Sequence, residues 1–248
     1  MATVRSNPRQ TIEADRTTGN TAVNPLTFQT GRNCMSLSNA YKIETERLVI
    51  RCYQPEDAGK LHEAITVSVD HLSPWMPWIN QEAGGMEGKL DRIRTFRGEF
   101  DLGKDYVFGI FNKAETKLIG STGLHTRAGE GAREIGYWIS TEFLKQGFAL
   151  ESVSALVKTG FELEALSRIE IHCSVENIPS QAIPKKLGFR LEAILKNNST
   201  DANEYPRENM IWSLLKADYD NNPVKKIAVK AFDIVGKELI FPRSSFHA

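Results

Sequence analysis

Apolar residues alternate or recur at helical spacing along most of the chain, and this pattern predicts an ordered series of elements. From Arg47 apolar and polar positions alternate, and Pro55 then begins a stripe with helical period, which predicts a strand followed by a helix. The predicted strands are residues 47–52, 106–111, 118–125, 133–140, 168–175, 189–196 and 208–215. The predicted helices are residues 55–65, 87–101 and 147–164, with a short helix ending before Gly188.

The order of these elements is strand, helices, three strands, helix, strand, helix and two strands. Such an order predicts an α/β (α+β) fold with one mixed, mostly antiparallel sheet of about seven strands flanked by helices. We expect this domain at residues 41–219. Residues 1–40 lack apolar periodicity and predict a flexible leader, whose composition also matches an organelle transit peptide loosely. Residues 220–248 predict a C-terminal extension with a small hairpin.

Charge and cysteine content exclude several classes of function. The 31 Lys and Arg residues balance the 31 Asp and Glu residues, so we expect no nucleic acid and no membrane as a partner. Cys34, Cys52 and Cys173 are odd in number and widely spaced, which predicts neither disulfides nor a metal site and indicates a reducing compartment, the cytoplasm. Both a monomer and a homodimer are compatible with the sequence.

A tight glycine turn between a strand and a helix is the first candidate for chemistry. Gly147 follows the strand that contains Glu134 and precedes the long predicted helix. The N-terminus of a helix presents unpaired N–H groups, and a glycine permits close approach of a phosphate. The alternative is a glycine that serves the turn only for steric reasons.

A second motif follows the next strand, where Asn177 and Ser180 precede the segment Leu187-Gly188-Phe189. Here the sequence resembles the GNAT superfamily of acetyltransferases, in its RimJ/RimL-like branch, over residues 43–217. The segments that carry the resemblance are residues 47–51, 75–78, 134–139, the glycine turn and 177–189.

The resemblance implies acetyl-CoA as acetyl donor and no metal. It implies a splay between the fourth and fifth strands, where the backbone of Trp138 and Ile139 pairs with pantetheine, and Asn177 and Ser180 reach the cofactor from the other side. The backbone of the turn would bind the pyrophosphate through residues Leu144, Lys145, Gln146, Gly147, Phe148 and Ala149. The acceptor would be a primary amine, either a protein N-terminus or a small molecule, which attacks the thioester directly in a ternary complex.

The resemblance also suggests catalytic groups, each with an alternative. Glu134 or His172 is the candidate general base, with a water chain as the third option. Ser180 is the candidate proton donor to the leaving thiolate, or simply a helix N-cap. Trp75 and Trp78 wall the amine pocket or pack in the core.

Three departures from the family pattern accompany these expectations. Leu144 stands where a Gln or Arg is usual and Leu150 where a Thr is common, and Pro184 falls inside the short helix.

Cys173 alternates with apolar neighbours and is expected to be a buried small hydrophobe. A domain that binds acyl-CoA without catalysis, as a sensor or structural module, is the competing hypothesis, which the joint presence of Glu134, Asn177 and Ser180 disfavours.

Overall fold

A computed structural model describes residues 40–76, 78–79, 85–200 and 205–242 of the chain. Of the predicted leader, only Ala40 falls among these residues, so the expectation for residues 1–39 lies outside the described part. Most of the predicted C-terminal extension is included.

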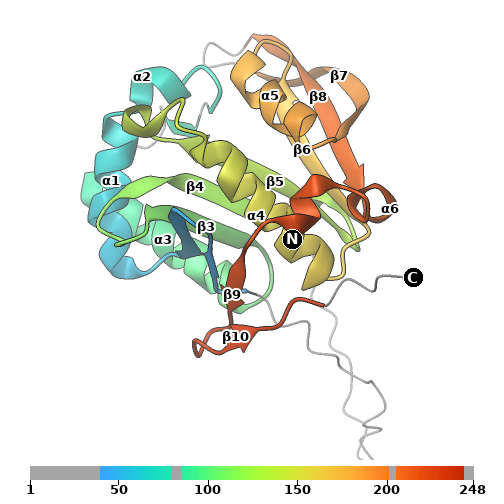
Figure 1. Cartoon of the computed structure of the whole chain (residues 1–248). Coiled ribbons are helices and arrows are strands. Elements are labelled where there is room, and N and C mark those ends of the chain that lie inside the picture. Colours follow the sequence, from blue (N-terminus) through green and yellow to red (C-terminus); the bar gives the residue numbers. More distant parts are fainter. Residues whose placement is uncertain (1–39, 77, 80–84, 201–204, 243–248) are drawn as a thin grey trace, which may run out of the picture. The chain divides into compact units, whose positions relative to one another are not determined.

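Within the described residues the strands form one sheet in the order β10-β9-β1-β2-β3-β4-β5-β6-β8-β7 (Figure 1). Every neighbouring pair is antiparallel except β5 and β6, which are parallel. This confirms the mixed, mostly antiparallel sheet. The strands are β1 (Lys42–Glu44), β2 (Leu48–Cys52), β3 (Tyr106–Asn112), β4 (Leu118–His125), β5 (Ala132–Ile139), β6 (Arg168–Ser174), β7 (Arg190–Thr200), β8 (Pro206–Leu215), β9 (Lys230–Phe232) and β10 (Glu238–Leu239).

The sheet has ten described strands where seven were predicted. The three additional strands, β1, β9 and β10, are two or three residues long. A run as short as β1 contains too few positions for alternation to be recognised in the sequence, whereas β9 and β10 lie in residues 220–248, where a small hairpin was expected. In the C-terminal part β9 and β10 form an antiparallel hairpin, and β9 also pairs with β1, so the hairpin continues the main sheet.

The parallel strands β5 and β6 pair over only three residues each. Ala132 lies opposite Arg168 and Glu134 opposite Glu170, and no pairing follows toward the ends of the two strands. Each strand therefore has a free edge beyond Glu134 and Glu170. The predicted splay between the fourth and fifth strands is confirmed.

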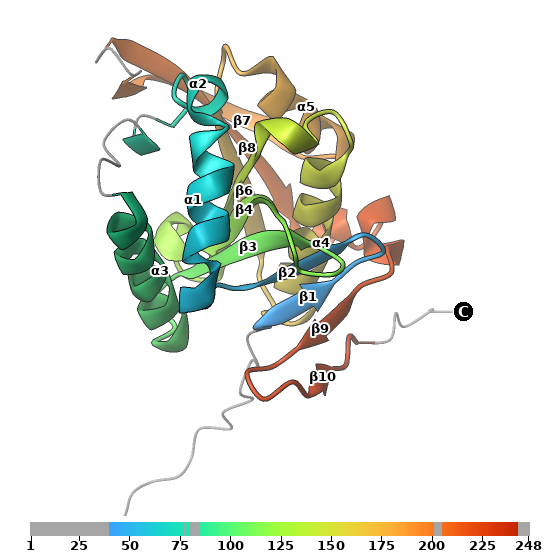
Figure 2. The same cartoon turned by 90° about the vertical axis from the view of Figure 1, so that its left-hand side faces the viewer.

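Helices cover both faces of the sheet, with α1 and α3 on one face and α4 on the other (Figure 2). Leu61 of α1 and Ile93 of α3 are buried against Val107 and Phe111 of β3, whereas Leu156 of α4 is buried in the core on the opposite face. The helices are α1 (Ala58–Thr66), α2 (Val69–Leu72), α3 (Gly85–Asp101), α4 (Phe148–Glu162), α5 (Ile178–Lys186) and α6 (Lys216–Tyr219), with 3-10 turns η1 (Pro55–Asp57), η3 (Thr126–Ala128), η4 (Thr141–Phe143) and η5 (Pro223–Lys226).

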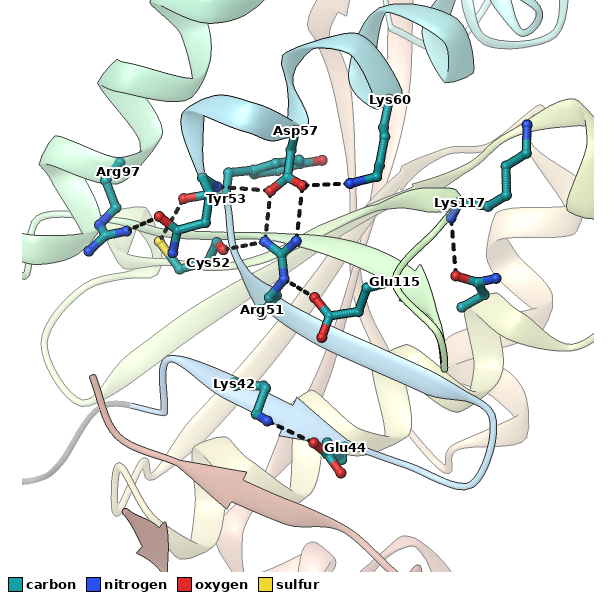
Figure 3. A network of polar contacts seen from close by, with 12 residues as sticks. Lys42, Glu44, Arg51, Cys52, Tyr53, Asp57, Lys60, Arg97, Glu115 and Lys117 are labelled. Atoms are coloured by element: carbon teal, nitrogen blue, oxygen red, sulfur yellow. Dashed lines mark hydrogen bonds and ion pairs between the residues drawn. The ribbon is translucent and has the colours of Figure 1, made fainter. Parts of the chain in front are cut away.

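A buried ion pair fixes the start of α1 beside β2 (Figure 3). The guanidinium of Arg51 donates to both carboxylate oxygens of Asp57, at 2.7 and 2.9 Å, and also contacts Glu115. Burial opposes ionisation of Asp57, but the hydrogen bonds from Arg51 and from the Gln54 N–H hold the pKa of this carboxyl below its usual value. Breaking such a pair from one side costs about 3–5 kcal/mol. The neighbouring Tyr53 is thereby held under α1.

Candidate active site

The glycine turn joins η4 to α4 in a backbone conformation that favours glycine. Gly147 is the N-cap of α4 with φ +83°, and Lys145 also has a positive φ of 59°. The first helical residues, Phe148 and Ala149, begin a helix of 15 residues, whose first-turn N–H groups have no intrahelical acceptor. Gly147 is exposed, so these N–H groups are open to an anion.

Arg47, at the start of β2, approaches this turn from a distant part of the sequence. Its guanidinium pairs with Glu151 at 2.6 Å, donates to the Gln146 carbonyl at 3.0 Å and lies 4.4 Å from the centre of the Phe148 ring. Leu144 packs against the core. Arg47 thus brings to the turn a cation that Leu144 does not provide, and neutralises the carboxylate in the first turn of α4.

Only alternate residues of β5 present their backbone to the splay. The Ser140 N–H donates to the Ile119 carbonyl of the β4 side at 2.8 Å, so the backbone groups of Trp138, two residues earlier, also face β4. Those of Tyr137 and Ile139 face the free edge. The geometry fits the expectation for the Ile139 backbone but not for that of Trp138, whose side chain instead lines a cavity.

Asn177 and Ser180 lie at the start of α5, and their roles differ from the expected ones. Asn177 is the N-cap, and its side-chain oxygen accepts the Ser180 N–H at 3.1 Å. The expectation that Ser180 caps the helix is therefore wrong. Ser180 sits in the first turn, so its hydroxyl is not used by a cap.

Pro184 leaves the carbonyl of Ser180 without its normal helical donor, because proline has no N–H. The helix nevertheless continues through Pro184 to Lys186. The Tyr137 hydroxyl lies 3.0 Å from the Ser180 carbonyl oxygen and 3.0 Å from the Ser180 Oγ. Tyr137 thus satisfies the carbonyl that Pro184 leaves free and holds Ser180 toward β5.

Glu134 and His172 face each other across the splay, on β5 and β6. The carboxylate of Glu134 accepts two hydrogen bonds of 2.6 Å from Arg127 of η3 and lies 3.4 Å from Nδ1 of His172. Burial raises the pKa of Glu134, but Arg127 and His172 outweigh it and leave the pKa below its usual value. His172 also contacts Glu170 through Nε2 at 2.7 Å. Both candidate bases therefore already have hydrogen-bond or ion-pair partners within the protein: Arg127 for Glu134, and two carboxylates for His172.

Two cavities meet at this point. The larger, about 350 Å³, lies under α1 and α3, and the smaller, about 290 Å³, lies in the splay and contains Glu134, His172 and Ser180. Trp78 lines the larger cavity and Trp75 the smaller, and both are partly exposed. Residues that line both cavities are Met76, Arg127, Gly136 and Tyr137.

Cys173 is 8% exposed and belongs to the core, and it also lines the smaller cavity. Cys52 and Cys173 are both free thiols.

Among the described residues no cluster of His, Cys, Asp or Glu is placed to hold a metal ion. No helix in this part of the chain has the length and apolar character needed to cross a bilayer.

A sheet that opens between two strands, an exposed helix start and two cavities with shared lining residues fit a transferase that brings two substrates together. Residues 47–190 match the acetyltransferase (GNAT) domain family. The uncharacterized N-acetyltransferase YoaA of Bacillus subtilis is 30% identical over 70% of this chain and 96% of its own length. The [ribosomal protein uS5]-alanine N-acetyltransferase of Escherichia coli is 24% identical over 72% of this chain and 92% of its own.

Among solved structures, the microcin C7 self-immunity acetyltransferase MccE, in complex with acetyl-CoA and AMP, has the same fold with a TM-score of 0.64. It is 20% identical, over 69% of this chain and 93% of its own. The chain belongs to the GNAT acetyltransferase family. It is an N-acetyltransferase that takes its acetyl group from acetyl-CoA and transfers it to an amine.

Proposed function

We propose that the protein acetylates the N-terminal amine of a protein by direct attack on acetyl-CoA in a ternary complex. One observation supports direct attack on the thioester. The cavity under α1 and α3 adjoins the cavity in the splay, and both are lined by Met76, Arg127, Gly136 and Tyr137. In this proposal an amine in the first cavity lies beside a thioester in the second, next to these shared residues. Reacting groups held side by side need no covalent enzyme intermediate.

The cofactor occupies the splay in this proposal. The turn from Leu144 to Ala149 binds the pyrophosphate through backbone N–H groups, and the backbone of Ile139 and Tyr137 pairs with pantetheine along the free edge of β5. Asn177 orders the start of α5, which carries Ser180 into the same cavity.

Ser180 is the proton donor to the leaving thiolate. A carbonyl oxygen only accepts, so the single proton of Tyr137 is committed when it bonds the Ser180 carbonyl. The Tyr137 oxygen is then an acceptor for the Ser180 hydroxyl. Burial raises the pKa of Tyr137, so Tyr137 keeps its proton. Ser180 also lines the cavity in the splay, so in this proposal its hydroxyl proton turns from the Tyr137 oxygen to the thiolate when the C–S bond breaks.

The cavity under α1 and α3 suits an acceptor with an apolar side and one polar group. Leu61, Ile65 and Trp138 supply apolar walls, whereas the fully buried Tyr53 hydroxyl has no hydrogen-bond partner there. The nearby Ser121 hydroxyl donates to the Phe108 carbonyl at 2.8 Å instead. An unmade buried hydrogen bond is costly, so the Tyr53 hydroxyl favours an acceptor that supplies a polar partner.

Two further lines support a protein acceptor in the cytoplasm. The relative from Escherichia coli is named as acting on an alanine of ribosomal protein uS5. The free thiols of Cys52 and Cys173 fit a reducing compartment.

The test is release of free thiol from acetyl-CoA with a panel of acceptors. The panel contains peptides with free N-terminal Ala, Ser or Met, the same peptides with a blocked N-terminus, and polyamines and aminoglycosides. We expect turnover with free N-termini and none with blocked ones. Turnover confined to polyamines or aminoglycosides would overturn the protein acceptor, and absence of thiol release with every amine would overturn the acceptor assignment as a whole.

A further inference from the structure

A histidine outside the residues assigned so far lies at the junction of the two cavities. His125, the last residue of β4, lines the larger cavity together with Gly136 and Tyr137. It is the cross-strand partner of Glu134, so the two side chains emerge from the same face of the sheet. His125 therefore stands beside the place where the acceptor meets the thioester.

Two glycines make room for its ring. Gly123 and Gly136 lie opposite each other on β4 and β5. A methyl carbon at Gly123 would stand 2.8 Å from Nε2 of His125, and one at Gly136 would stand 3.0 Å from the same atom. Contacts of this length are closer than carbon and nitrogen atoms tolerate, so no residue with a side chain fits at either position without displacing the imidazole. The two glycines thus leave the space that the imidazole occupies beside β4 and β5.

Asp105, directly before β3, sets the proton position on this ring. Its Oδ2 lies 2.7 Å from Nδ1 of His125, and its Oδ1 accepts the Thr126 N–H at 3.1 Å. Burial opposes ionisation of Asp105, but the hydrogen bond from His125 and the other donors hold the pKa of the carboxyl below its usual value. An ionised carboxylate only accepts, so Nδ1 carries the proton. In the neutral ring Nε2 then carries a lone pair.

The other bases at the junction are less available. Glu134 has both oxygens bonded to Arg127, and His172 lies between the carboxylates of Glu134 and Glu170. Within the described part of the chain, Nε2 of His125 has no hydrogen-bond partner. An idle basic nitrogen at the edge of a substrate cavity is what a general base requires.

We propose that His125 is the general base of the transfer and that Asp105 is its positioning residue. The inference rests on the proposed function. Nε2 removes one proton from the acceptor ammonium, and the freed amine forms the C–N bond to the thioester carbonyl. The C–S bond breaks, and the thiolate receives its proton from Ser180. The nitrogen gives up its second proton as the amide forms, and this proton, passed through water in the cavity, restores the Ser180 hydroxyl. Imidazolium, stabilised by Asp105, returns its proton to water through the open cavity.

Four charged groups face His125, three from secondary-structure elements and one from the residue before β3. Asp105 precedes β3, Arg127 belongs to η3, Glu134 to β5, and Arg92 of α3 lines the same cavity. Because Arg127 and Glu134 neutralise each other, Asp105 is the charge in direct contact with the ring. The pH dependence of the reaction should therefore change most when His125 or Asp105 is substituted.

The first test compares His125→Gln, Asp105→Asn and the rival His172→Gln, with His71→Gln on α2 as a matched histidine outside both cavities. We expect His125→Gln to lower kcat/KM about 10²–10⁴-fold, the range for loss of a general base, and to change the pH profile. Free imidazole should restore part of the activity of His125→Ala. Thermal shifts induced by acetyl-CoA should stay at the parental value, which shows that fold and cofactor site are intact.

Asp105→Asn should lower turnover by a similar factor, because an amide N–H facing Nδ1 favours the ring tautomer with its proton on Nε2. Parental kcat/KM and pH profile in His125→Gln would overturn the proposal, and a loss confined to His172→Gln would transfer the role to His172.

A second measurement does not depend on any acceptor. Nitrogen NMR of the imidazole, recorded in the parent at a pH where the ring is neutral, should show the proton on Nδ1, and Asp105→Asn should move that proton to Nε2. A neutral ring protonated on Nε2 in the parent would overturn the proposal. A parent that shows the expected tautomer but acetylates no amine would refute the proposed function instead, so the two failures are distinguishable.

Discussion

Gly147→Val should have two separate effects: backbone strain in the turn, which lowers the stability of the protein, and obstruction of the pyrophosphate, which lowers its affinity for acetyl-CoA. At φ +83° an L-residue costs about 1–2 kcal/mol in the left-handed region, and a β-branched residue costs more. The nearest atom to an added Cβ is Nη2 of Arg47 at 3.5 Å, an ordinary contact, so Gly147→Val is strained but not blocked by the protein itself. The valine side chain should instead obstruct the close approach of the pyrophosphate to the backbone of the turn.

The expected losses of affinity and of thermal stability can be estimated from the lost hydrogen bond to the pyrophosphate and from the backbone strain. Loss of one hydrogen bond to a charged group is worth about 1.5–3 kcal/mol, so Gly147→Val should weaken acetyl-CoA binding roughly 10- to 100-fold. Strain alone should lower Tm by about 2–4 °C per kcal/mol. Gly236 is the matched control, because it has φ +79° and no heavy atom within 4 Å of an added Cβ.

Isothermal titration with acetyl-CoA and thermal melting are the assays. Both Gly147→Val and Gly236→Val should melt earlier than the parent, but only Gly147→Val should lose affinity. Parental affinity in Gly147→Val would show that the pyrophosphate does not bind at this turn. Equal loss of affinity in both variants would show that strain, not contact, is responsible.

Three further predictions concern the cofactor site and the core. Arg47→Ala should weaken acetyl-CoA binding several-fold, because the Glu151 carboxylate in the first turn of α4 loses its cation and keeps only hydrogen bonds from the Thr45 hydroxyl and the backbone N–H of residue 47. Glu151→Gln in that background should restore much of the affinity, and failure of this rescue in a titration would contradict the electrostatic explanation. Ser180→Ala should lower kcat but leave the Kd for acetyl-CoA unchanged, and stopped-flow detection of free thiol distinguishes this from a binding defect. Burial raises the pKa of Glu164 to about 7 from 4.5, so the stability it contributes below the lower value is lost as pH rises toward the higher one. Glu164→Gln should therefore gain stability relative to the parent at about pH 7.5 but not at about pH 5 in urea unfolding, and an equal difference at both values would refute the linkage.

The longer elements of the fold were predictable because each repeats its pattern several times. The helix predicted at 147–164 is observed as α4, Phe148–Glu162, and the strand at 118–125 is observed as β4, Leu118–His125. The sequence also contained a signal for the true start of α5, because Pro179 stands two residues after Asn177, and a proline is common in a first helical turn. Ser180 is an equally common N-cap residue, so composition alone did not distinguish the two.

The site was only partly predictable, for a geometric reason. The glycine turn is local in sequence, and so is the Asn177 motif. Arg47, by contrast, reaches Glu151 across 104 positions, and the ring of His125 depends on the register of β4 and β5. No periodicity encodes which loops or strands meet in space. The resemblance to the family supplied Glu134 and His172 as bases, but the loop that brings Arg127 onto Glu134 carries no signal in the sequence.

During synthesis β1 cannot complete its pairing until β9, near the other end of the chain, has left the ribosome. Lys42 lies opposite Phe232, so the partner of the first strand leaves the ribosome about 190 residues later, roughly 10–40 s at usual rates of synthesis. Until then the outer edge of β1 presents unpaired N–H and C=O groups, the kind of template on which chains associate wrongly. A stalled or truncated chain that ends before β9 should therefore depend on chaperones more than the finished protein does.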